Sequence, residues 1–211
     1  MICLADNDII SKLATSDLLD EALVAFGVAH SDVFVLPAAV HVLLRPSKPG
    51  KGKFKPDGIE YRRLAAFFER VNVVNTVPSA EEQFAFNDAM GIDPGEAILF
   101  SATAEHPDFL LATGDKKCLV GLASSKGDVF LGVQTRLAGR VICFEQTILE
   151  IIERFGFDSV REKVIPARHC DMALRAVFGS GLEATEASVR AGLESYIDDL
   201  RRRTGSLLLI R

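Results

Sequence analysis

Short apolar runs that stop at an acidic residue, each followed by a helical pattern, are the feature that most constrains the fold of this chain. Residues 2–5 are followed by Asp6, and residues 110–112 by a Thr-Gly step and Asp115. Runs this short and this apolar are typical of strands buried on both faces of a parallel sheet. The carboxyl ends of parallel strands share one edge of the sheet, where such folds place their chemistry. We therefore expect acids from distant segments to meet at that edge.

Strand and helix patterns alternate along most of the sequence. Strands are expected at residues 1–5, 33–36, 71–77, 109–112 and 140–144. Helices are expected at residues 7–26, with a break near 15–17 where Ser16 would cap the second half, from residue 37, around residues 64–71, and at 79–90, 94–105 and 115–123. This alternation predicts an α/β fold with a mostly parallel central sheet between two helical layers.

The strand patterns stop after Glu145, and only helical faces follow. One such face comprises apolar residues between 148 and 155, and another those between 189 and 200. A chain of 211 residues fits one domain, or one domain with an appendage. We therefore predict an α/β domain over residues 1–145 and a helical C-terminal extension over residues 146–211.

Composition narrows the class of protein. With 48% hydrophobic and 25% charged residues, the sequence is typical of a soluble globular protein, and a net charge of -5 argues against a generally basic nucleic-acid binder. No apolar stretch is long enough to span a bilayer, and no signal peptide is recognisable. The four scattered cysteines form no Cys-x-x-Cys pair, which favours buried thiols in a reducing compartment. We expect a cytoplasmic protein without a membrane partner.

The acids at the expected sheet edge have two explanations, and the sequence leaves both open. Asp93 and Glu96 have the spacing of a capping box around Pro94, and Asp6 or Asp115 could each cap the helix that follows it. Alternatively, the acids converge and bind Mg²⁺ or Mn²⁺, which prefer carboxylate oxygens. Such ions support phosphodiester hydrolysis because they activate water and stabilise the charge at phosphorus.

Three motifs in this order resemble the PIN-domain nucleases. Residues 4–13 are similar to the opening of that family, an apolar strand followed by an Asp and a helix. Residues 95–104 resemble its acid at the head of an alanine-rich helix, and residues 111–115 resemble its strand ending in Thr-x-Asp. The resemblance covers roughly residues 1–145. It implies the three-layer fold expected above.

The resemblance also implies a site and a function. Asp6, Glu96 and Asp115 would be the catalytic acids that bind Mg²⁺ or Mn²⁺. Asp8 and Asp93 are further candidate ligands, which could compensate for an acid that the family has and this chain lacks. The activity would be that of a metal-dependent endoribonuclease acting on an RNA substrate. By the same resemblance, the chain could be the toxin of a toxin–antitoxin pair, inhibited by an antitoxin-like protein partner. Apart from the resemblance, the helical C-terminal extension could supply a surface for a homodimer.

One departure from the family pattern motivates alternatives. The family carries a Glu on the helix after the second strand, whereas that position falls near Leu43 and the nearest polar side chain is His41. The chain could therefore be a catalytically degenerate PIN-like module that binds a partner. A third hypothesis is a phosphatase of the haloacid dehalogenase class, in which Asp6 would be the nucleophile and Asp8 the acid/base.

A local basic strip lies within this acidic protein. Residues 45–63 carry seven basic and two acidic side chains. The strip could be a solvated loop, or a flap that contacts phosphates beside the acids, with Phe54 and Tyr61 stacking on bases. The candidate nucleic-acid-binding lysines are Lys48, Lys51, Lys53 and Lys55.

Overall fold

The computed structural model describes residues 1–44, 54–55 and 58–210. The strands are β1 (Ile2–Ala5), β2 (Val33–Val35), β3 (Asn72–Val73), β4 (Phe109–Thr113) and β5 (Val141–Cys143). The helices that precede β5 are α1 (Asn7–Thr15), α2 (Leu19–Phe26), the 3₁₀ turn η1 (His30–Asp32), α3 (Ala39–Leu43), α4 (Ile59–Phe68), α5 (Ala80–Asn87), α6 (Pro94–Ala102), α7 (Lys116–Ser124) and α8 (Asp128–Leu137). Those that follow it are α9 (Phe144–Phe155), α10 (Phe157–Ala167), η2 (Arg168–Cys170), α11 (Met172–Val177), η3 (Gly181–Glu183) and α12 (Glu186–Thr204).

A parallel sheet forms the centre of the fold, as predicted. Its five described strands have the order β3-β2-β1-β4-β5, and every pairing is parallel. In the register of the two central strands, Ala5 of β1 lies opposite Ala112 of β4. Every residue of β4 is buried, and only the first residue of β1 is partly exposed, because helices cover both faces of these strands. The α/β fold class is therefore confirmed.

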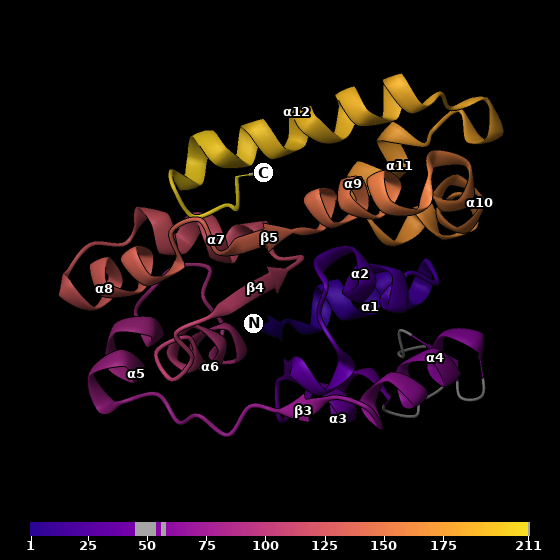
Figure 1. The fold of residues 1–211 in the computed structure, drawn as a ribbon. Helices are drawn as coiled ribbons and strands as arrows, with labels where there is room; N and C mark the ends of the chain where they lie inside the picture. The colour runs from indigo at the N-terminus through magenta and orange to yellow at the C-terminus, as the bar shows by residue number, and fades with distance from the viewer. Residues whose placement is uncertain (45–53, 56–57, 211) are drawn as a thin grey trace.

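The helices fall into two packing groups. α1 contacts α2, α3 and α4, and α2 contacts α9, whereas α5 contacts α6 and α8, and α7 contacts α8. The chain runs from β1 outward to β2 and β3, and then from β4 outward to β5 in the opposite direction. Because right-handed crossovers place their helices on opposite faces when this direction reverses, the two groups cover opposite faces of the sheet. In Figure 1, α1 and α2 lie to the right of β4, whereas α5 and α6 lie to its lower left.

The C-terminal helices close the β5 side of the molecule. α12 contacts both α7 and α9, and Figure 1 shows it running along α7, β5 and α9. The residues after α12 pair with β5: the Val141 amide donates to Leu207 at 3.1 Å, and the Leu209 amide donates to Val141 at 2.7 Å. These bonds satisfy backbone groups that an open edge strand would leave exposed. The boundary predicted between residues 145 and 146 falls inside α9.

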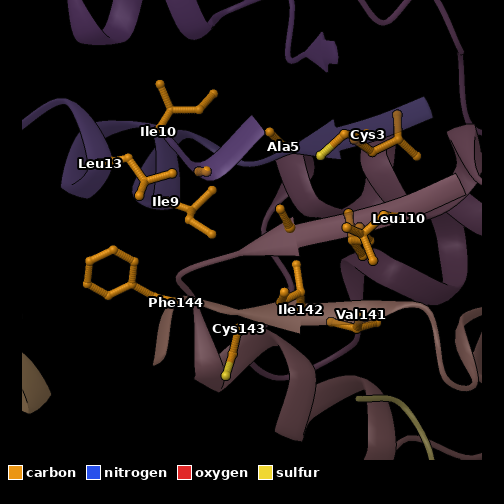
Figure 2. Close-up of a cluster of buried hydrophobic side chains, with 14 of the residues drawn as sticks. Cys3, Ala5, Ile9, Ile10, Leu13, Leu110, Val141, Ile142, Cys143 and Phe144 are labelled. Carbon is orange, nitrogen blue, oxygen red and sulfur yellow. The ribbon is translucent and has the colours of Figure 1, made fainter. Parts of the chain in front are cut away.

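One hydrophobic cluster runs from the sheet into the C-terminal helices. It includes Leu4 of β1 and Leu193 and Ile197 of α12. Figure 2 shows part of the cluster, where side chains of β1, β4 and β5 lie near those of α1 and Phe144. All four cysteines are free, and Cys3, Cys118 and Cys143 are buried while Cys170 is half-buried. Burial raises the pKa of Cys3 to about 12, so its thiol is unreactive at neutral pH.

Several expected elements differ from those observed. The strand expected at residues 71–77 comprises only Asn72–Val73, and both of these residues are exposed. It is the outermost strand of the sheet, so it has a neighbouring strand on one side only. The break in the first helix is confirmed, but Ser16 does not cap α2: its hydroxyl donates to the Lys12 carbonyl at 3.0 Å at the end of α1. Helix α8 was not expected from the sequence.

None of the helices in the described ranges combines the length and apolar character needed to cross a bilayer.

Candidate functional site

The candidate site lies at the carboxyl edge of the two central strands. Asp6 directly follows β1, and Asp115 comes two residues after the end of β4. The chain leaves β1 toward β2 on one side and returns through β4 on the other. Such a reversal of strand order opens a crevice at the carboxyl edge, where parallel α/β folds bind their ligands. The position therefore agrees with the site expected from the sequence.

Asp6 is held rigidly by three hydrogen-bond donors. As N-cap of α1, it accepts the Ile9 amide through Oδ1 at 2.7 Å. Its Oδ2 accepts the Gly114 amide at 3.0 Å and the Thr113 hydroxyl. These bonds join the start of α1 to the loop after β4, so the two segments that carry Asp6 and Asp115 are fixed to each other.

The pKa of Asp6 is raised from 3.8 to about 6. Burial is the main cause, since the residue is only 5% exposed, and the neighbouring charge of Asp8 acts in the same direction. The bonds from Ile9, Thr113 and Gly114 oppose the rise because they stabilise the ionised form. Asp6 is therefore mostly ionised at pH 7, within reach of protonation under mildly acidic conditions.

Glu96 joins the same group of charges from the start of α6. Together with Asp93 it forms the predicted capping box: the Glu96 amide donates to Asp93 Oδ1 at 2.9 Å, and Glu96 accepts the Asp93 amide. The pKa of Glu96 is raised from 4.5 to about 8, first by burial and then by the charges of Asp93, Asp115 and Asp6. The three predicted catalytic acids are thus close enough to influence one another.

Asp115 is half-buried and is the most accessible of the three predicted catalytic acids, since Asp6 and Glu96 are buried. It caps α7, where its Oδ1 accepts the amides of Lys117 at 2.7 Å and Cys118 at 3.2 Å. Its own amide donates to the Thr113 hydroxyl at 3.0 Å. The thiol of Cys118 packs beside the group, and its pKa is raised by burial and then by the charges of Glu96, Asp6 and Asp115.

The cap explanation holds for three of these acids, while metal binding by the acids that lie near one another stays a prediction. Asp6, Asp93 and Asp115 each cap a helix. Asp6, Glu96 and Asp115 nevertheless interact across three segments far apart in sequence. Capping alone would place them at helix starts without bringing those starts together.

A divalent ion is not matched by the present arrangement. The donors are carboxylate oxygens, which suit Mg²⁺ or Mn²⁺ chemically. However, the described part of the chain contains no group of three or more His, Cys, Asp or Glu side chains arranged so that it could hold a metal ion. In this structure the described acids therefore form no preformed metal centre, and binding of Mg²⁺ or Mn²⁺ by Asp6, Glu96 and Asp115 stays a prediction.

The position at which the PIN-domain pattern carries a Glu is occupied by an apolar residue that lies in an apolar environment. Leu43 is 6% exposed and belongs to the hydrophobic cluster. His41, the nearest polar side chain, is exposed, so it is not the buried core residue that an apolar stretch would suggest. α3 thus brings no carboxylate to the acid edge.

The basic strip lies largely outside the described residues. Lys48, Lys51 and Lys53 fall there, while Lys55 is described and exposed. Phe54 is 8% exposed and packs in the hydrophobic cluster. The expectation that its ring stacks on bases is therefore wrong in this structure, because the ring is covered by the core.

Three ion pairs at this edge, formed by two lysines, were missed by the sequence reasoning. Lys12 pairs with Asp8 at 2.6 Å and with Asp171 at 2.8 Å. Lys116 pairs with Glu145, which is 1% exposed and whose Oε2 has no hydrogen-bond partner among the described residues. Only the spacing of Asp8 and Lys12, four residues apart on a helix, was visible in the sequence. The other partners lie far away along the chain.

The phosphatase alternative gains no support from this geometry. A nucleophilic Asp6 would need an accessible oxygen, yet the residue is buried and accepts three hydrogen bonds. Asp8, the expected acid/base, is paired with Lys12. Trapping a phosphoenzyme at Asp6 would favour the phosphatase hypothesis over the nuclease hypothesis.

Comparison with protein-family models, with curated proteins and with solved structures found no match to this chain.

Proposed function

We propose that this chain is a PIN-like nuclease that cleaves phosphodiester bonds in RNA, with Asp6, Glu96 and Asp115 as its acids. The observation that carries the proposal is the meeting of these three residues, from three distant segments, at the reversal of strand order. RNA as the substrate rests on the resemblance of residues 1–145 to PIN-domain nucleases.

The protonation states at this edge suit acid–base chemistry. With a pKa of about 8, Glu96 retains most of its proton at pH 7. With a pKa of about 6, Asp6 is largely ionised at the same pH. Two carboxyl groups with separated pKa values are a recurring arrangement in acid–base catalysis. Asp6 is enclosed, so we assign it to holding the Thr113–Gly114 loop, and the partly exposed Asp115 to meeting the substrate.

A cleavage assay tests this proposal. Labelled single-stranded RNA and DNA would be incubated with the purified chain in Mg²⁺, in Mn²⁺ and in EDTA. We expect RNA cleavage that requires the divalent ion and is lost in Asp6→Asn and Asp115→Asn. Asp128→Asn, which changes an exposed acid of α8, is the matched control and should retain wild-type activity. Full activity in EDTA, or in the Asp6→Asn variant, would refute the proposal.

Toxicity is a separate part of the proposal. If the nuclease is the toxin of a toxin–antitoxin pair, expression of the wild type should arrest growth, and Asp115→Asn should not. Co-expression of an antitoxin-like partner should restore growth. Equal growth of the two strains without that partner would remove the toxin assignment while leaving the nuclease to the cleavage assay.

A second candidate is a PIN-like module that binds a partner without catalysis. It is favoured by the apolar α3 position at Leu43 and by the lack of a metal-holding group among the described residues. Calorimetry with Mn²⁺ separates the two candidates. Heat that disappears in Asp115→Asn supports the nuclease, whereas no binding by the wild type favours the module.

A further inference from the structure

A lysine ammonium occupies a cradle of oxygen atoms beside the acid edge. Lys12 Nζ lies 2.6 Å from Asp8 Oδ2, 2.8 Å from Asp171 Oδ2 and 3.4 Å from the Gly114 carbonyl oxygen. Lys12 is only 9% exposed, and its ammonium also lies 5.3 Å from the centre of the Phe144 ring. A buried cation is thus surrounded by two carboxylates, a carbonyl and an aromatic face.

The cradle is built from three segments that meet only in the folded chain. Asp8 and Lys12 lie one turn apart on α1, and Gly114 belongs to the loop whose amide holds Asp6. Asp171 caps α11, where its Oδ1 accepts the amides of Ala173 and Leu174 while Oδ2 is directed to Lys12. Lys12 therefore joins the acid edge to the C-terminal helices.

Gly114 allows this close approach. A Cβ atom at this position would lie 2.3 Å from Asp8 Oδ2 and 3.1 Å from the Ile9 nitrogen. A larger residue would require either the Asp8 carboxylate or the loop to shift, which would disturb the contacts around the ammonium. Glycine is thus needed here for space.

The ammonium is firmly charged. Burial alone would lower the pKa of Lys12, but the hydrogen bonds and charges of Asp171 and Asp8 outweigh it and raise the pKa above its ordinary value. Burial tends to raise the pKa of Asp171, yet its bond to Lys12 lowers it overall. Lys12 and Asp171 are therefore both ionised at neutral pH.

We propose that the Lys12 ammonium is the resident cation of this edge, and that Asp8, Asp171 and the Gly114 carbonyl form a latent divalent-cation site from which the ammonium excludes metal. Oxygen donors with two negative charges are what Mg²⁺, Mn²⁺ and Ca²⁺ bind. The lysine supplies the positive charge from within the chain, which removes the need for an ion at this position. The same contact fixes the C-terminal helices to the loop that carries Asp115.

Mn²⁺ binding by variants of the full chain tests the proposal. Lys12→Ala vacates the cradle and should bind one more Mn²⁺ than the wild type, counted by calorimetry and by electron paramagnetic resonance. Lys12→Met removes the charge but keeps the volume, so it should bind no additional ion. Lys12→Ala combined with Asp171→Asn should lose the additional ion, because one charged ligand is gone while Asn can still cap α11.

Two results would overturn the proposal. One is a folded Lys12→Ala variant that binds no more Mn²⁺ than the wild type. The other is an equal gain of Mn²⁺ by Lys12→Met, which would show that the ion does not occupy the vacated cradle.

Thermal unfolding keeps the test decisive if Lys12→Ala is too unstable for calorimetry. A ligand that binds only the native state stabilises it, so Mn²⁺ should raise the melting temperature of Lys12→Ala well beyond any rise in the wild type. No such difference would refute the proposal. This comparison is independent of the nuclease assignment, because it reports only the difference in Mn²⁺ binding between Lys12→Ala and the wild type. The number of Mn²⁺ ions bound by the wild type itself tests the separate proposal for Asp6, Glu96 and Asp115.

Discussion

The unusual protonation of Glu96 should make the stability of this protein fall as the pH rises. The folded-state pKa of Glu96 is about 8, against an ordinary value of 4.5. A carboxyl group whose folded pKa is raised stabilises the fold fully below its unfolded pKa, and this contribution is lost as the pH rises through the folded pKa. For Glu96 the loss amounts to roughly 4 kcal/mol of unfolding free energy between pH 4 and pH 8. Asp6, with a pKa of about 6, adds roughly 2 kcal/mol over the lower part of this range.

Glu96→Gln isolates the larger of these two effects. Glutamine keeps the oxygen that accepts the Asp93 amide in the capping box, but it cannot ionise. We therefore expect the variant and the wild type to be nearly equal in stability at pH 4. The variant should become the more stable protein by roughly 4 kcal/mol at pH 8, while both retain the slope due to Asp6.

Urea unfolding at several pH values between 4 and 8 measures this difference. The chain has no tryptophan, so unfolding is best followed by circular dichroism. Glu82→Gln is the matched control, because Glu82 completes the same kind of capping box with Ser79 at the more exposed start of α5. Its stability difference from the wild type should be small at every pH. A Glu96→Gln variant that is less stable than the wild type at pH 8 would refute the reasoning.

Three further substitutions test the packing around the site. Gly114→Ala places a Cβ 2.3 Å from a carboxylate oxygen of Asp8 and should lower the melting temperature. Gly132→Ala, where the added Cβ has open space, should be neutral or stabilising by up to about 1 kcal/mol. Equal melting temperatures of the two variants would contradict the close approach at Gly114. Leu43→Glu buries a charge in the core and should cost roughly 3 kcal/mol or more at pH 7 in urea unfolding, and an unchanged midpoint would show that this position reaches water. Leu193→Ala should cost about 2 to 5 kcal/mol in the same assay, and Leu182→Ala, which is 71% exposed, should cost little; a stable Leu193→Ala variant would mean that α12 is not part of the core.

Local patterns were sufficient to predict most of the fold. The buried runs of β1 and β4 and the capping box of Asp93 and Glu96 depend on residues close together in the chain. β3 was predicted too long, because its apolar residues resemble a buried strand although this outermost strand is exposed. α8 was missed, and so was the covering of β5 by residues 207–209. That pairing is between segments more than sixty residues apart, which periodicity does not report.

For the candidate site, too, some features could be predicted from the sequence and others could not. That Asp6 and Asp115 would meet followed from sequence, because parallel strands bring their carboxyl ends to one edge. The pKa of Glu96 did not follow, since it depends on burial and on distances among charges from several segments. Nor did the role of Asp171, whose partner Lys12 is more than 150 residues away in the chain.

The sequence by itself determined the parallel α/β plan and the edge at which its acids gather, because apolar period and capping chemistry act over a few residues. Only the tertiary structure decided which charges face one another. It set Lys12 between Asp8 and Asp171 and placed the side chain of Leu43 in the core. The physical reason is that electrostatic interactions and burial depend on distances in space, and the packing of distant segments sets those distances.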